Sequence, residues 1–340
     1  MNHNSKVLMC VRKVVLSRLV FVFIMFAVIP SDASEMKETL RKSLAASLAV
    51  PEAIQWVTLG PLSDKRIISL EIRYHSERGT GGPKIRRGKS PDQFQVDFPR
   101  LRIAKVPIIA DATFACSKYP SLCFHMQEYL NRVDQEYDIE NVPFIDELYP
   151  KYAADLERIR SGKYWAASIL ASVEAVVLAI NLHELGHAVL EHDLSGAPIS
   201  TATILRQEAE ADGFLLGFME ITELSAVGGA VVLLQNVFRE EVFGELTIKH
   251  PRPSCRAAAF TNQATQWVRA NLPRLKESSL DAEIDRLSMS AIDSMPLLSK
   301  LLDILNRRVQ GCDDYNKHVA IGVHKTAQLL DEDTPLKTSP

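Results

Sequence analysis

The chain has 340 residues, of which 46% are hydrophobic and 24% charged, and this balance is typical of a globular protein rather than a disordered one. Its 39 Lys and Arg residues are offset by 42 Asp and Glu residues, so the net charge of −3 argues against nucleic acid as a partner.

The N-terminus has the pattern of a secretory signal. Four basic residues between positions 6 and 18 precede an apolar run over 19–30, which is shorter than the roughly 20 residues of a transmembrane helix. Small residues follow, and they predict cleavage after Ala33; the alternative is an uncleaved signal anchor. Cleavage removes four Lys or Arg residues and one Asp, leaving 35 basic and 41 acidic residues. We expect a periplasmic or secreted protein, with peripheral membrane association left open.

Four cysteines follow the signal: Cys116, Cys123, Cys255 and Cys312. In an exported chain they predict two disulfides, most simply Cys116–Cys123 and Cys255–Cys312, although three pairings are open. Free buried thiols are the alternative if the chain is not exported. Because no Cys-x-x-Cys pair is present, we do not expect a cysteine-ligated zinc.

The first part after the signal combines one helix with strands. Residues 36–57 have the pattern of a short amphipathic helix, and 65–75, 93–98 and 101–109 have the character of strands, which predicts a small sheet. The segment 79–90 ends in Gly-Lys-Ser like a phosphate-binding loop. Pro83 stands where such a loop needs glycine, so we expect a basic hairpin loop and no nucleotide.

From Phe124 onward the pattern is mainly helical, with expected helices at 124–136, 143–160, 163–192, 201–220, 222–242, 256–271 and 279–309. The apolar run 165–180 carries Glu174 and is short for a membrane span, so it predicts a buried helix. We therefore expect a mostly helical α+β protein. Its expected parts are a signal (1–33), an α/β part with the sheet (34–125), a helical core (126–330) and a flexible tail (331–340).

One stretch of this helical core carries metal-binding chemistry. His183 and His187 are four residues apart, so on a helix they project from one face and can bind one metal ion, with Glu184 turned toward the same opening. This is the zinc-protease pattern His-Glu-x-x-His. Two hydrogen-bonded core histidines are the alternative.

A catalytic zinc usually takes three protein ligands, and the next helix offers the third. Glu208 lies on the apolar face of that helix, with Asp212 one turn further on, and a buried carboxylate needs a metal or a cation beside it. We expect Glu208 to bind the metal and Asp212 to contact the outer nitrogen of a ligand histidine. Glu210 is expected on the opposite, solvated face. A surface helix with a skewed pattern is the alternative.

Two residues closer to the motif compete for the third ligand. Asp193 is six residues after the second histidine, as in metzincins, but Leu190 replaces the glycine that this pattern needs. His192 has the wrong spacing for the same helix face. The sequence therefore favours Glu208.

Three motifs in order now carry a resemblance: His183-Glu-Leu-Gly-His187, Glu208-Ala-Glu-Ala-Asp212 and His250-Pro-Arg-Pro-Ser-Cys-Arg256. Together they resemble the gluzincin metallopeptidases, most closely the group of CAAX-prenyl endopeptidases, heat-shock membrane proteases and their soluble periplasmic relatives. The motifs span about a fifth of the chain. The strand with a Gly-rich turn that usually precedes the zinc helix is not evident.

This resemblance implies a zincin-like fold and one Zn²⁺ per chain, held by His183, His187 and Glu208. The zinc would activate a water molecule, and Glu184 would take its proton and pass it to the leaving amine. His250 and Arg256 would stabilise the oxyanion; a plain loop and a surface arginine are the alternative for these two.

The implied function is a zinc endopeptidase in envelope protein quality control, acting on unfolded or misassembled polypeptides. Two other functions are kept open. One is a zinc-binding module that recognises a partner without hydrolysis, and the other is a secreted effector or toxin protease with one target.

Overall fold

The computed structural model describes residues 33–49, 53–75, 84–161, 165–194, 198–221, 251–277, 311–330 and 336–339. Within these ranges the chain forms an α+β fold that is mostly helical with one small sheet, as the sequence predicts. The predicted signal, except Ala33, and the predicted helices 222–242 and 279–309 lie outside the described residues.

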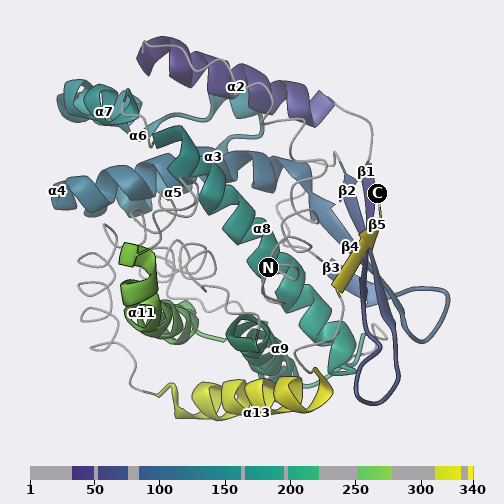
Figure 1. Ribbon diagram of the computed structural model, residues 1–340. Coiled ribbons are helices and arrows are strands. Elements are labelled where there is room, and N and C mark those ends of the chain that lie inside the picture. Colours follow the sequence, from purple (N-terminus) through teal and green to yellow (C-terminus); the bar gives the residue numbers. More distant parts are fainter. Residues whose placement is uncertain are drawn as a thin grey trace.

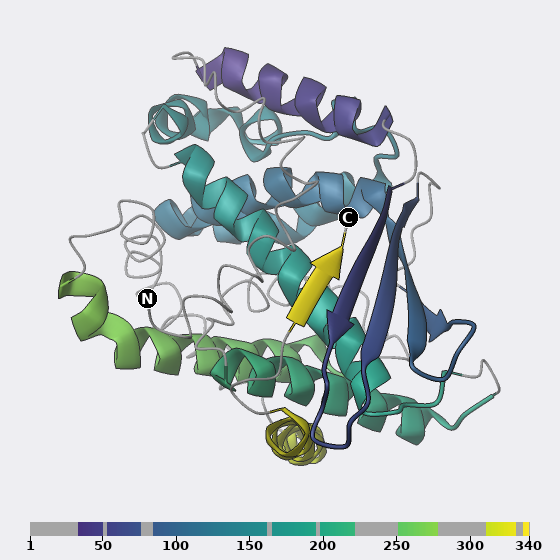
Figure 2. The same cartoon turned by 45° about the vertical axis from the view of Figure 1, so that its right-hand side comes forward.

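The sheet has five strands in the order β3-β4-β2-β1-β5. The strands are β1 (Ala53–Leu59), β2 (Ile68–His75), β3 (Lys84–Arg87), β4 (Gln93–Pro99) and β5 (Leu336–Ser339). Strands β2 and β4 are parallel, and the other neighbouring pairs are antiparallel. The last strand therefore brings the C-terminal end of the chain beside β1, as Figure 2 shows.

One face of the sheet is buried against helices because its strands alternate apolar with more polar residues. Val57, Leu70, Ile72 and Val96 are all buried on that face. They share a core with α8 (Trp165–Val189), α9 (Thr201–Ile221), α11 (Pro253–Glu277) and α13 (Asp313–Leu329). The sheet thus forms one wall of the core that contains the candidate site.

The other helices form a second core. They are α2 (Ala33–Ala49), α3 (Arg100–Lys118), α4 (Pro120–Cys123), α5 (Met126–Gln135), α6 (Ile145–Leu148) and α7 (Ala153–Arg160), with 3₁₀ turns η2 (Ile139–Asn141) and η3 (Pro150–Tyr152). In this core Arg160 is buried between Asp111 and Asp146, at 2.6 and 2.8 Å, so its charge is paired. The predicted domain boundary near 125 stays a prediction.

Helix α8 connects the two cores. It runs diagonally between the helical layer around α3 and the group formed by α9, α11 and α13 (Figure 1). Its first half contributes Trp165 and Ile169 to one core, and its second half contributes Val177 and Leu182 to the other. Among the described helices, none is long and apolar enough to span a membrane.

The disulfide Cys255–Cys312 ties the first turn of α11 to the residue before α13, as the sequence predicts. Cys116 is also disulfide-bonded. The side chain of Cys123 lies outside the described residues, so its pairing with Cys116 stays a prediction.

We expect the double variant Cys255→Ser/Cys312→Ser to lose stability. The bond closes a loop with a sequence separation of 57 residues. Loop-closure entropy for that length corresponds to about 4 kcal/mol, and measured losses are commonly about 2–4 kcal/mol. Urea unfolding of the oxidised wild type and of the variant measures the difference. Equal free energies of unfolding would show that the bond stabilises little.

One predicted helix is too long, and one predicted strand is wrong. The predicted helix 36–57 ends at Ala49 and is followed by strand β1, whose residues Trp56, Val57 and Thr58 favour a strand. The predicted strand 101–109 is the first half of α3, because burial of Ile108 and Ile109 among other helices outweighs their β propensity.

Other predictions differ in extent. The segment 79–90, predicted as a basic hairpin loop, contains strand β3, which pairs with β4, and 76–83 lie outside the described residues. The predicted helix 143–160 is divided into α6, η3 and α7, where Pro150 begins the 3₁₀ turn. The tail predicted to be flexible contains β5, and α13 was not predicted. Both missed elements depend on partners far away in the sequence.

Candidate metal centre

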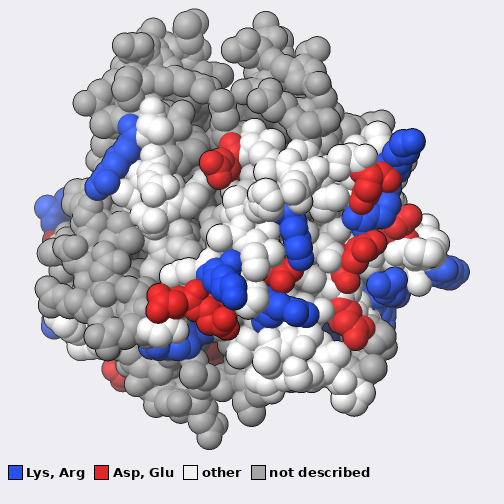
Figure 3. All heavy atoms as spheres, turned by 90° about the horizontal axis from the view of Figure 1, so that it is seen from below, with Lys and Arg blue, Asp and Glu red and all other residues white. Residues whose placement is uncertain are grey.

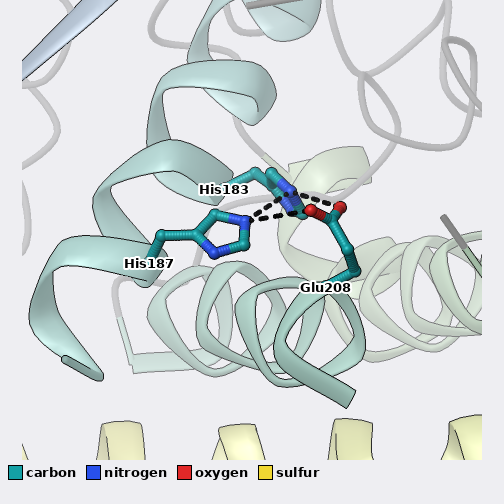
Figure 4. Close-up of side chains that lie close together, drawn as sticks. All are labelled: His183, His187 and Glu208. Atoms are coloured by element: carbon teal, nitrogen blue, oxygen red, sulfur yellow. Dashed lines mark hydrogen bonds and ion pairs between the residues drawn. The ribbon is translucent and has the colours of Figure 1, made fainter. Parts of the chain in front are cut away.

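Two histidines and one glutamate converge between α8 and α9. Figure 4 shows the rings of His183 and His187 from α8 and the carboxylate of Glu208 from α9 pointing toward one another. The two Nε2 atoms are 3.3 Å apart, and Glu208 oxygens lie 3.3 Å from His183 Nε2 and 3.5 Å from His187 Nε2. These three residues could hold a metal ion, as the sequence predicts.

The spacing of these atoms fits a small tetrahedral ion. A zinc ion with bonds of about 2.0–2.1 Å in tetrahedral geometry places its ligand atoms about 3.3–3.4 Å from one another. The two Nε2 atoms, 3.3 Å apart, have this separation, and they lie 3.3 and 3.5 Å from different oxygens of Glu208. Two imidazoles and a carboxylate are also the donor set of many catalytic zinc sites.

The glycine inside the motif brings the two helices close together. A Cβ atom at Gly186 would lie 2.9 Å from the Cβ of Phe214, which is closer than real Cβ contacts. Glycine therefore permits α9 to pack directly on α8. That approach lets the side chain of Glu208 reach both histidines.

Asp212 lies behind His183, as predicted, with Oδ1 2.9 Å from Nδ1 of the histidine. Arg256 donates two hydrogen bonds to this carboxylate, at 2.7 and 2.6 Å, and Tyr315 donates a third at 3.1 Å. A carboxylate at this nitrogen favours the tautomer whose Nε2 lone pair is free for a metal. Asp212 is fully buried, so these partners compensate its charge.

The disulfide lies beside this network. Cys255 precedes Arg256 at the start of α11, and Cys312 stands three residues before Tyr315. The bond therefore joins the two segments whose side chains hold Asp212. Two nitrogens of Arg256 are used by Asp212, and the oxyanion role expected for this arginine stays a prediction.

His183 and His187 differ in their protonation. Burial opposes a charged His183, but its contacts with Asp212 and Glu208 outweigh burial and raise its pKa to about 10. Burial lowers the pKa of His187 to about 3, with Glu208 opposing it only in part. Without a metal, His183 therefore carries an additional proton and a positive charge, and His187 is neutral. A metal cation would displace that proton, so binding should weaken as pH falls.

The other predicted residues have different positions. Glu184 is buried, 8% exposed, and precedes His187 by three residues, which places the two as neighbours on the helix surface. Asp193 is exposed beyond the end of α8 and is not part of the metal-binding group. His250 lies outside the described residues, so its role stays a prediction.

After α8 the chain reverses direction toward the site. The amide of His192 donates to the carbonyl of His187 at 3.0 Å, and that of Glu191 donates to Ala188 at 3.3 Å. With Glu191 at φ 56°, this pattern is a Schellman cap. The cap buries His192 and places its Nδ1 atom 2.9 Å from Nδ1 of His187. His192 has the wrong spacing for a ligand, but it contacts a ligand from behind.

The prediction of a solvated Glu210 is wrong, because α13 covers this side of α9. Glu210 is 7% exposed, and Lys325 of α13 donates to it at 2.7 Å. His192 Nε2 lies 3.6 Å from the same carboxylate oxygen. In the view of Figure 3, from the side on which α13 lies, acidic and basic side chains of the described residues are interspersed.

Glu210 gives a pH-dependent prediction. The contacts with His192 and then Lys325 outweigh burial and lower its pKa from 4.5 to about 2. Because the folded-state pKa is depressed, this stabilisation is present above pH 4.5 and is lost as pH falls toward about 2. Glu210→Gln should lower the free energy of unfolding by about 2 kcal/mol at pH 7 and by progressively less below pH 4.5. Urea unfolding of wild type and variant at several pH values measures this difference in free energy. A difference that does not change with pH would contradict the prediction.

Comparisons with protein-family models, with curated proteins and with solved structures found no match. The residues themselves define a candidate metal-binding group, three side chains from α8 and α9 that could hold a metal ion. The contacts of His192, Tyr315 and Lys325 could not be found from spacing, because they depend on the helix cap and on the packing of α13.

Proposed function

We propose that this protein is a zinc-dependent endopeptidase. The observation that carries the proposal is the convergence of His183, His187 and Glu208, whose donor atoms lie within 4.8 Å of one another. The 3.3 Å between the two Nε2 atoms suits a tetrahedral zinc ion that keeps one position for water or substrate. Glu184, on the same helix as the two histidines, is the residue type that such an enzyme needs as a general base.

Each residue has a proposed task. His183, His187 and Glu208 hold the metal, which when bound polarises a carbonyl and activates a water molecule. Asp212 orients His183, and Arg256 and Tyr315 hold Asp212. Glu184 takes a proton and returns it to the leaving amine. His250 and Arg256 are proposed to assist at the developing oxyanion, as the gluzincin resemblance implies.

The proposed substrates are unfolded or misassembled polypeptides in the cell envelope. This part rests on the resemblance to gluzincin proteases and on the signal-like N-terminus. The disulfide Cys255–Cys312 suits an oxidising compartment.

Glu184→Gln tests the reaction. Because the amide cannot accept the proton, cleavage of unfolded casein by the zinc-loaded protein should fall at least about 100-fold, within the range typical of general acid–base catalysis. Zinc content should be unchanged, since Glu184 is not a ligand. Activity is measured by release of labelled peptides. Equal cleavage by wild type and variant would reject the protease, and zinc binding without any cleavage would instead favour a recognition module.

A further inference from the structure

The contact between His187 and His192 sets the hydrogen positions on both rings. Their Nδ1 atoms are 2.9 Å apart, so one carries a hydrogen and the other accepts it. For a neutral His187 to offer the lone pair of Nε2 to a metal, its hydrogen must be on Nδ1. His192 must then accept at Nδ1 and carry its own hydrogen on Nε2.

The surroundings of His192 favour this arrangement. Its Nε2 atom is buried, and the carboxylate oxygen Oε2 of Glu210 lies 3.6 Å away, an electrostatic contact that is too long for a hydrogen bond. Lys325 holds the same oxygen at 2.7 Å, and Arg206 and His318 lie 3.9 and 4.0 Å from the other oxygen. A carboxylate next to Nε2 stabilises a hydrogen there and leaves Nδ1 as the acceptor.

The backbone fixes the position of His192. The Schellman cap at the end of α8 returns the chain so that His192 reaches the residue five positions before it. His192 is only 4% exposed, so water has little access to compete for the contact. Both ligand histidines are thus backed by a buried partner, Asp212 for His183 and His192 for His187.

We propose that His192 is a positioning residue that accepts a hydrogen bond from His187 Nδ1 and so directs the Nε2 lone pair of His187 to the metal, with Glu210 and Lys325 orienting His192. The proposal rests on the proposed metal site but not on peptidase activity. It extends the metal-supporting network from α8 through α9 to α13.

The test measures zinc affinity of the purified full chain by competition with a chromophoric chelator, without substrate. Residues behind metal ligands typically contribute about 10- to 100-fold to affinity, so His192→Leu should weaken zinc binding by that factor. His192→Asn keeps an acceptor oxygen near the Nδ1 position and should stay within about threefold of wild type. His318→Asn is the matched control, because His318 borders Glu210 without contacting a ligand histidine in any described contact.

A second readout does not depend on the variants. In the zinc-free wild type near pH 7, ¹⁵N NMR should identify the Nδ1–H tautomer of His187 and the Nε2–H tautomer of His192. The opposite tautomers would overturn the proposal, as would equal zinc affinity of His192→Leu and wild type. It would also fail if His192→Asn were as weak as His192→Leu, or if His318→Asn weakened binding equally. Wild type that binds no zinc would overturn both this proposal and the metal site.

Discussion

Replacing Glu208 by alanine is expected to remove most of the zinc that the proposed site binds. Two histidines alone leave an incomplete site, and changes behind the ligands already cost about 10- to 100-fold in affinity, so losing a ligand should weaken zinc binding by more than about 100-fold. Metal analysis after dialysis against a weak chelator should find about one zinc per wild-type chain and little in the variant.

Two comparisons make the Glu208→Ala result specific. Glu184→Gln is the matched control, because it changes a buried glutamate that follows His183 in the chain and is not one of the three converging residues. It should retain its zinc. Zinc at about 100 times its Kd should also stabilise the wild type by about 2.7 kcal/mol, and Glu208→Ala should lose this gain. Unchanged zinc content in Glu208→Ala would show that another residue completes the site.

The metal-binding group could be predicted from sequence because its geometry follows from helix periodicity. Spacings of four residues place His183 near His187 and Glu208 near Asp212 on their helix faces, whatever the rest of the fold. The pairing of the two faces was inferred from the cost of burying Glu208. Burial of Asp212 and the contacts of both carboxylates with His183 agree with that inference.

The surroundings of the group could not be predicted in the same way. Glu210 is on the face of α9 that periodicity assigns to solvent, but α13 packs there and supplies Lys325. His192 reaches His187 through a backbone cap whose key residue, Glu191, is not the glycine that usually signals such a turn. Strand β5 depends on pairing with β1, about 280 residues earlier in the chain.

Gly322→Ala is expected to separate α13 from α9 and to destabilise the protein strongly. A Cβ atom at position 322 would lie 2.2 Å from the carbonyl oxygen of Glu210 and 2.9 Å from the Cα of Gly213. Both are backbone atoms, so the helices must move apart rather than a side chain turn away. Such overpacking typically costs about 1–3 kcal/mol. Separation would also weaken the contacts that Tyr315 and Lys325 make with α9.

The sign of the change in the free energy of unfolding distinguishes this packing effect from helix propensity. In an exposed helix, Gly→Ala would stabilise by about 1 kcal/mol, so propensity alone predicts the opposite result. Gly217→Ala is the matched control on the same pair of helices, since its Cβ would meet the side chain of Thr326 at 3.1 Å. Urea unfolding should give a clear loss for Gly322→Ala and a smaller change for Gly217→Ala. Because α13 contacts both Asp212 and Glu210, zinc affinity should fall in Gly322→Ala and stay unchanged in Gly217→Ala. If Gly322→Ala bound zinc as tightly as wild type, the metal-binding group would not depend on how closely α13 packs.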